Sequence, residues 1–145
     1  MIILEKKLIC FVNEDSGKLL LRLSIAILML FHGFKKFHSG IGGIKALVFN
    51  AGLPDFFAYG VYFGEIIIPI LLIIGLYTRI SAFIFSINMC GAIFLALSDK
   101  IFMLDPKTGG LMIELPLLYL LSSFVIVFLG AGKYSIDSKL QHYQK

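Results

Sequence analysis

The sequence predicts an all-α integral membrane protein, folded as an antiparallel four-helix bundle with a short interfacial helix between the first and second spans. Of its 145 residues, 59% are apolar and only 15% are charged, whereas a soluble domain averages roughly 45–50% and about 25%. The mean hydropathy is +0.93. The apolar residues form long runs without two-residue alternation, which favours membrane helices over strands. We therefore treat the chain as a single membrane domain.

Four apolar segments are the predicted spans, and they cover about residues 19–34, 56–76, 80–97 and 111–129. At a rise of about 1.5 Å per residue they reach roughly 24–31 Å, close to the thickness of the hydrocarbon core. The link at residues 77–79 is very short, so the second and third spans are expected to be antiparallel neighbours.

The segment between the first two spans has a pattern of its own. Ile41, Ile44, Leu47 and Val48 recur at helical spacing, which predicts a short helix lying on the membrane surface. Four spans place both termini on one side, and that side carries more Lys and Arg than the other. The positive-inside rule therefore predicts cytoplasmic termini, and the net charge of +4 is attributed to span ends facing lipid rather than to nucleic-acid binding.

Ionisable residues inside a span are costly, so they are functional candidates. Glu65 is the deepest of them, and Pro69 follows four residues later without an N–H to donate to the Glu65 carbonyl. A catalytic or binding site and a protonated, purely structural glutamate are equally compatible with this pattern. The nearby Gly60-x-x-x-Gly64 pattern could bring a partner helix close to that carboxylate.

Helix direction places further polar residues at the same end of the bundle as Glu65. The expected group comprises His32, Lys36, Glu65, Asn88 and Glu114. Such a pocket could bind a quinone head group or relay protons. Structural alternatives stay open for its members. His32 could face water, and Glu114 could stabilise a helix N-terminus. Lys36 and the neighbouring Lys35 could be interfacial anchors.

Several kinds of chemistry lack their usual residues. Cys10 and Cys90 lie far apart and no C-x-x-C occurs, so neither a zinc site nor a dithiol centre is expected and no metal is assigned. The sequence also lacks a phosphate loop, a dinucleotide fingerprint and a Ser-His-Asp arrangement.

The order of the polar motifs resembles the DoxX family of small four-helix membrane proteins. The resemblance covers about residues 20–138 and is carried by these segments: Arg22, His32-Gly33, Lys36, Gly52-Leu53-Pro54, Glu65, Gly75-Leu76-Tyr77-Thr78-Arg79, Glu114 and Gly130-Ala131-Gly132-Lys133-Tyr134-Ser135-Ile136-Asp137. It implies a multi-pass protein of a bacterial-type inner membrane. Some family members are membrane subunits of quinone-reducing complexes, and others work with soluble enzymes that handle thiols and oxidative stress.

The resemblance also draws attention to the cytoplasmic end. Arg22, Arg79, Lys133 and Asp137 are all expected there. Asp137 could pair with either arginine. This group is interpreted either as a clasp that closes the bundle or as a docking surface for a partner.

Three functions remain in order of preference. The first is an accessory or anchoring subunit of a membrane redox system that is linked to quinones or thiols. The second is a subunit that itself binds quinone near Glu65, and the third is a small transporter. The expected partners are membrane lipids, soluble redox enzymes or another membrane subunit, and a second copy of the chain; quinone is the only cofactor considered.

Overall fold

The computed structural model describes residues 13–143, and it is helical throughout this range apart from its connections. Within these residues the strand-like pairing is limited to an isolated bridge between Leu104 and Leu111. Three helices of the described part are long and apolar enough to cross a membrane: Glu14–Ser39, Asp55–Ile74 and Thr78–Lys100. The predicted all-helical class is therefore confirmed.

The secondary-structure elements follow one another with few long connections. They are α2 (Glu14–Ser39), α3 (Gly42–Asn50), η1 (Asp55–Tyr59), α4 (Gly60–Tyr62), η2 (Phe63–Ile67), α5 (Ile68–Ile74), α6 (Thr78–Leu97), η3 (Ser98–Lys100), α7 (Glu114–Leu129) and α8 (Ile136–Tyr143). The elements from η1 to α5 are consecutive turns of one apolar helix, in which η2 is a π-helical turn. α7 is a shorter apolar helix of 16 residues.

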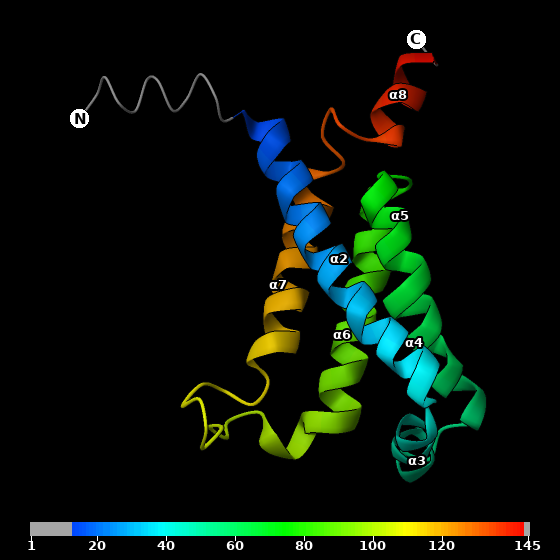
Figure 1. The fold of residues 1–145 in the computed structure, drawn as a ribbon, viewed down its shortest axis with the longest axis vertical. Coiled ribbons are helices and arrows are strands. Elements are labelled where there is room, and N and C mark those ends of the chain that lie inside the picture. Colours follow the sequence, from blue (N-terminus) through cyan, green and yellow to red (C-terminus); the bar gives the residue numbers. More distant parts are fainter. Residues whose placement is uncertain (1–12, 144–145) are drawn as a thin grey trace.

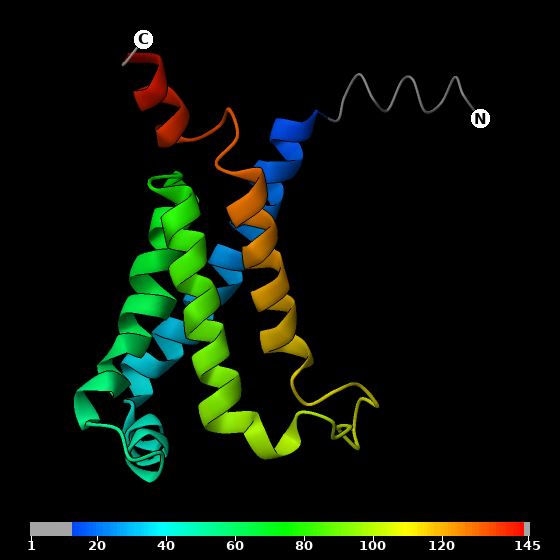
Figure 2. The same cartoon turned by 180° about the vertical axis from the view of Figure 1, so that it is seen from behind.

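The helices run between two ends of the molecule. α2 crosses the others obliquely, in front of them in Figure 1 and behind them in Figure 2. α5 and α6 run antiparallel, and so do α6 and α7. The start of α2 and α8 lie at one end, called here the α8 end, while α3 and residues 98–113 lie at the opposite end, called the α3 end (Figure 1). The terminal residues 1–12 and 144–145 are outside the described part.

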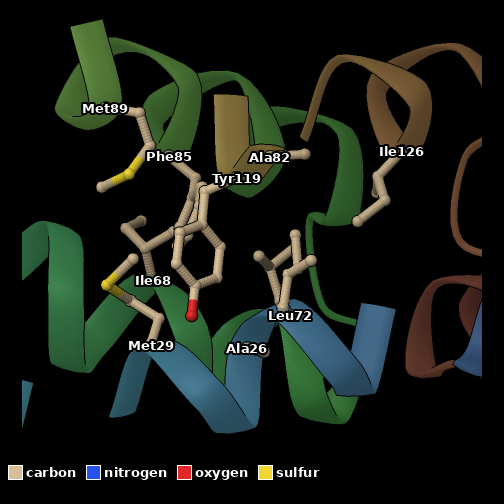
Figure 3. Close-up of a cluster of buried hydrophobic side chains, with 10 residues drawn as sticks. Ala26, Met29, Ile68, Leu72, Ala82, Phe85, Met89, Tyr119 and Ile126 are labelled. Carbon is tan, nitrogen blue, oxygen red and sulfur yellow. The ribbon is translucent and has the colours of Figure 1, made fainter. Parts of the chain in front are cut away.

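The main core is built where α2, α5, α6 and α7 meet (Figure 3). Its buried members are Ile25, Ala26, Met29, Ile68, Leu72, Ala82, Phe85, Met89, Tyr119 and Ile126. A buried hydrogen bond of 2.8 Å between Ser86 Oγ and Ser123 Oγ joins α6 to α7 inside this core. Outward-facing side chains are also apolar, for example Phe31 and Phe128, which are largely exposed. An apolar surface around an apolar core is what a lipid environment requires.

A close helix crossing fixes α2 against η2. A Cβ atom added to Gly33 of α2 would lie 2.5 Å from the Glu65 carbonyl oxygen and 2.7 Å from Ile66 Cγ1. Glycine at this position therefore lets the two backbones touch, as small residues do at membrane helix interfaces.

We expect Gly33→Ala to push α2 away from η2 and to lower the free energy of unfolding by about 1–3 kcal/mol. The matched control is Gly17→Ala on the same helix, where a Cβ meets nothing within 4 Å. That change should leave stability unchanged or raise it by up to about 1 kcal/mol. Thermal unfolding of both variants in mild detergent measures the difference; equal midpoints would contradict the crossing described here.

Candidate functional site

A buried ion pair lies near the α3 end of the molecule. Lys36 Nζ of α2 donates to Glu65 Oε1 of η2. The Glu65 side chain is only 4% exposed, while that of Lys36 is 34% exposed. An ionised carboxylate this deeply buried requires a partner of opposite charge. Lys36 supplies it while keeping part of its stem at the surface.

Pro69 explains the unusual backbone at Glu65. Proline cannot donate to the carbonyl four residues before it, and its ring crowds that carbonyl. The turn before it is widened accordingly: Ile68 N donates to Phe63 O, five residues earlier, and Phe63–Ile67 form a π-helical turn. Such single π-turns within α-helices are frequent at functional sites.

Asn88 of α6 extends the polar group from the opposite side. Its amide packs against Gly64, where an added Cβ would lie 2.5 Å from Asn88 Oδ1. Both Asn88 Nδ2 and Glu65 Oε2 are buried without a hydrogen-bond partner. Buried polar atoms are nearly always satisfied in folded proteins, so an unmet donor and an unmet acceptor on residues that line one cavity make this group a candidate binding site.

A cavity of about 450 Å³ adjoins this group. Its polar lining is Lys36, Glu65 and Asn88. The rest of its wall is apolar and comes from α3, the η1-to-η2 turns and α6: Ile44, Leu47, Val48, Leu53, Phe57, Ala58, Gly60, Val61, Phe63, Gly64, Ile84, Ile87, Gly91, Ala92, Phe94, Leu95 and Ala96. Gly60 belongs to the predicted packing motif, but it lines this cavity, and a Cβ added to it would meet nothing within 4 Å. It therefore makes no close contact with another helix.

A second, smaller cavity of about 200 Å³ also has Glu65 in its wall. It is lined by Met29, His32, Glu65, Met89, Ala92, Leu115, Pro116 and Tyr119. The His32 and Tyr119 rings meet edge to face with their centroids 6.3 Å apart. Figure 3 shows the Tyr119 hydroxyl directed away from α7, towards the side of the core where Met29 lies. Glu65 is therefore common to two cavities.

Lys45 and Tyr59 connect α3 to η1 beside the large cavity. Lys45 Nζ donates to Tyr59 Oη at 2.9 Å and lies 4.8 Å from the centre of that ring. This hydrogen bond is the main cause that raises the pKa of Lys45 above its ordinary value.

Four of the five predicted ligand-binding residues are brought together around Glu65. Lys36, Glu65 and Asn88 line the large cavity, and His32 lines the small one. Glu114 does not join them, because it is exposed in the first turn of α7, with its carboxylate beside Gly110. Within residues 13–143 no three His, Cys, Asp or Glu side chains are grouped so as to hold a metal. Cys90 is exposed, and Cys10 lies outside the described residues.

At the α8 end, buried Arg22 ties α2 to the segment that follows α7. Its Nη1 donates to Ala131 O at 2.8 Å and its Nη2 to Tyr134 O at 2.7 Å. Gly75 leaves room for this guanidinium, since a Cβ there would lie 2.5 Å from Nη1. Arg79 Nη1 donates to Val127 O in a similar way.

Asp137 bonds to backbone N–H groups instead of to the arginines. Its two carboxylate oxygens accept from Tyr77 N at 2.7 Å and Thr78 N at 2.8 Å, at the start of α6. The predicted pairing of Asp137 with Arg22 or Arg79 is therefore not formed. The first N–H groups of a helix lack partners within that helix and attract an anion, and Asp137 binds to them instead. Lys133 takes part through its backbone, whose N–H donates to Asp15 Oδ1 at 2.9 Å.

Comparison with known proteins places these features in a family. Residues 17–98, more than half of the chain, match the sequence profile of the DoxX family. The chain belongs to the DoxX family. As a DoxX protein with three apolar helices in its described part, it is a membrane protein. The matched residues include Lys36, Glu65 and Asn88.

Two relatives of this DoxX protein are known from bacteria. An uncharacterised protein of Haemophilus influenzae is 40% identical over 124 residues, which cover 82% of this chain and 87% of that protein. A Bacillus subtilis protein named "Putative oxidoreductase CatD" is 38% identical over 79 residues, covering 54% of this chain and 58% of that protein. No solved structure matches.

Gly91 of the DoxX site was not singled out from the sequence, since which side of a helix faces a cavity depends on helix rotation. Gly33 was noted only as part of a family segment, although it lies three residues before Lys36 on the same face of α2. Tyr119 was considered as a donor to a ligand, with an interfacial position as the alternative.

We expect Asp137→Ala to lower the free energy of unfolding by about 1–2 kcal/mol, the usual cost of losing a helix N-terminal acceptor. The Tyr77 amide, whose N–H loses its Asp137 Oδ1 acceptor, should also exchange faster. Asp137→Asn should lie between wild type and Asp137→Ala, because one amide oxygen remains to accept. Hydrogen exchange of residues 75–79 reports the effect. Asp99→Asn, at an exposed position on η3, is the control, and similar exchange in all variants would refute the assignment.

Proposed function

We propose that this protein is a membrane subunit of a redox system and that it binds a quinone in the large cavity. One observation carries the proposal: unpaired, buried Glu65 Oε2 and Asn88 Nδ2 stand beside Lys36 on the wall of an otherwise apolar cavity. An apolar pocket with a few convergent polar groups is the usual form of a small-molecule site. This observation favours the quinone-binding function over a purely anchoring one.

The chemistry of the polar group suits a quinone in both oxidation states. Quinone carbonyl oxygens are acceptors, and Lys36 Nζ and Asn88 Nδ2 are donors. The hydroxyls of the reduced form are donors, and Glu65 Oε2 is an acceptor without a partner. The cavity volume of about 450 Å³ lies within the range of about 300–1,000 Å³ of ligand pockets, and its apolar wall suits the ring and the first part of a hydrocarbon tail.

Electrons would reach the quinone from a partner. The relative from Bacillus subtilis named as an oxidoreductase supports a redox role. The partner expected from the sequence is a soluble redox enzyme or another membrane subunit. The docking function considered for Arg22, Arg79, Lys133 and Asp137 has less support, because these residues are engaged in contacts that close the α8 end.

The proposal includes the arrangement in the membrane. α7, at about 1.5 Å per residue, reaches about 24 Å and would complete a four-helix bundle with the three long helices. α3 would lie in the interface, and its Val48 and Ile41 pack with Ala58 in a second apolar cluster. The excess of Lys and Arg supports an inner-membrane protein with its α8 end in the cytoplasm. A homo-oligomer is compatible with the exposed apolar faces.

We expect Gly91→Phe to weaken quinone binding by at least about tenfold, equivalent to about 1.4 kcal/mol. Gly91 lines the large cavity, and a Cβ there meets nothing within 4 Å, so the ring enters the space proposed for the quinone without displacing the core. Binding of decylubiquinone to the protein in lipid nanodiscs is measured by equilibrium dialysis. The control is Cys90→Phe, the neighbouring exposed position of α6.

Glu65→Gln and Lys36→Met test the polar end of the same site. Both should weaken decylubiquinone binding by removing an acceptor or a donor, while circular dichroism shows the helices intact. Wild-type affinity in all three cavity variants would exclude quinone binding at this site.

A further inference from the structure

We propose that Glu65 exchanges its proton with the aqueous phase through the small cavity, and that His32 is the group that carries the proton between water and that carboxylate. This proposal rests on the proposed function, because reduction of a quinone consumes protons and the route described here would supply them. Its test, however, requires no quinone.

The two oxygens of Glu65 have different surroundings. Oε1 accepts from Lys36 Nζ, whereas Oε2 is buried and has no partner. The same side chain lines both cavities. A carboxylate held by one oxygen and free at the other can take up a proton at Oε2 while Oε1 still accepts a hydrogen bond from Lys36, although the ion pair is lost when the carboxylate is neutralised. Glu65 is therefore suited to pass a proton between the two spaces.

The two cavities reach the surface in different surroundings. The large one is bordered by exposed aromatic side chains, among them Phe57, Phe63 and Phe94, so its open side suits lipid. The small one is lined by His32 and Leu115, both of which are exposed, and Leu115 directly follows the exposed Glu114 at the start of α7. An exposed imidazole and a nearby exposed carboxylate suit an aqueous boundary. The proposal therefore assigns the water-facing side of Glu65 to the small cavity.

The size and lining of the small cavity suit water. Its volume of about 200 Å³ exceeds several times the roughly 30 Å³ that one water occupies in the liquid. His32, Tyr119 and Glu65 provide polar partners along it. A short file of waters between His32 and the Glu65 side chain is thus compatible with the volume and the polar groups, and a small rotation of the carboxyl group would bring its buried Oε2 to that file.

The charged and titratable groups around Glu65 single out His32. α2 contributes Lys36 and His32, α7 contributes Tyr119, and α6 contributes the neutral Asn88. Lys36 is bonded to Oε1, and tyrosine ordinarily gives up its proton only near pH 10. Histidine alone among these types ordinarily changes charge near neutral pH. In the transfer, the imidazolium releases a proton to the intervening water and Oε2 receives one, so neutral imidazole and a carboxylic acid result.

The test follows the Glu65 carboxyl group by infrared spectroscopy in nanodiscs without quinone. After a rapid jump from neutral to acidic pH, the band of the protonated acid should appear in wild type and be absent in Glu65→Gln. We expect His32→Ala to slow its appearance by at least about tenfold, the scale of a lost proton-transfer group. His32→Gln, which keeps the size and polarity of the side chain, should be equally slow.

Two controls separate the route from other effects. His38→Ala removes the other exposed histidine of α2, which lines neither cavity, and this variant should exchange at the wild-type rate. Gly91→Phe fills the large cavity and should also leave the rate unchanged. Wild-type rates in both His32 variants, a slow Gly91→Phe, or the absence of any Glu65 acid band in wild type would each overturn the proposal. Failure of decylubiquinone binding with His32-dependent exchange intact would instead overturn only the proposed function.

Discussion

A carboxylate buried among apolar helices must be matched by a cation, and much of this molecule is arranged around that requirement. Lys36 reaches Glu65 only because α2 comes into contact with the backbone of η2, and that contact depends on the missing side chain of Gly33. Pro69 widens the turn that carries Glu65. Glu65 lines both cavities next to this crossing.

At the α8 end, charged side chains are satisfied by backbone groups instead of by side chains of opposite charge. Arg22 is buried, yet its partners are backbone carbonyls rather than an acid. Asp137 likewise bonds to backbone N–H groups. Arg22 thus satisfies carbonyls of the connection between α7 and α8, and Asp137 satisfies N–H groups at the start of α6 that have no partner within that helix. The segments at residues 75–79 and 130–137 meet here, and these contacts are those of the clasp expected from the sequence.

The sequence predicted the apolar helices, the burial of Glu65 and the proximity of Lys36, because hydropathy and helix direction determine depth. It did not predict which residues share a face across helices. Glu114 was placed at the right level, but it lies on the exposed side of α7. The sequence suggested that Asp137 pairs with an arginine. Its actual partners, the N–H groups of Tyr77 and Thr78, could not be predicted, because the sequence does not show that residue 137 lies next to the start of α6. The cavities depend on helix rotation, which periodicity in an apolar helix leaves undetermined.

The contacts of Arg22 also constrain how the chain can be assembled. The carbonyls that receive this guanidinium belong to Ala131 and Tyr134, which are 109 and 112 residues further along the chain. During synthesis α2 is therefore made long before its charge has these acceptors. We expect Arg22 to keep its guanidinium hydrated until residues 131–134 have been made. Contact with those carbonyls would then fix the position of α2 relative to the later helices.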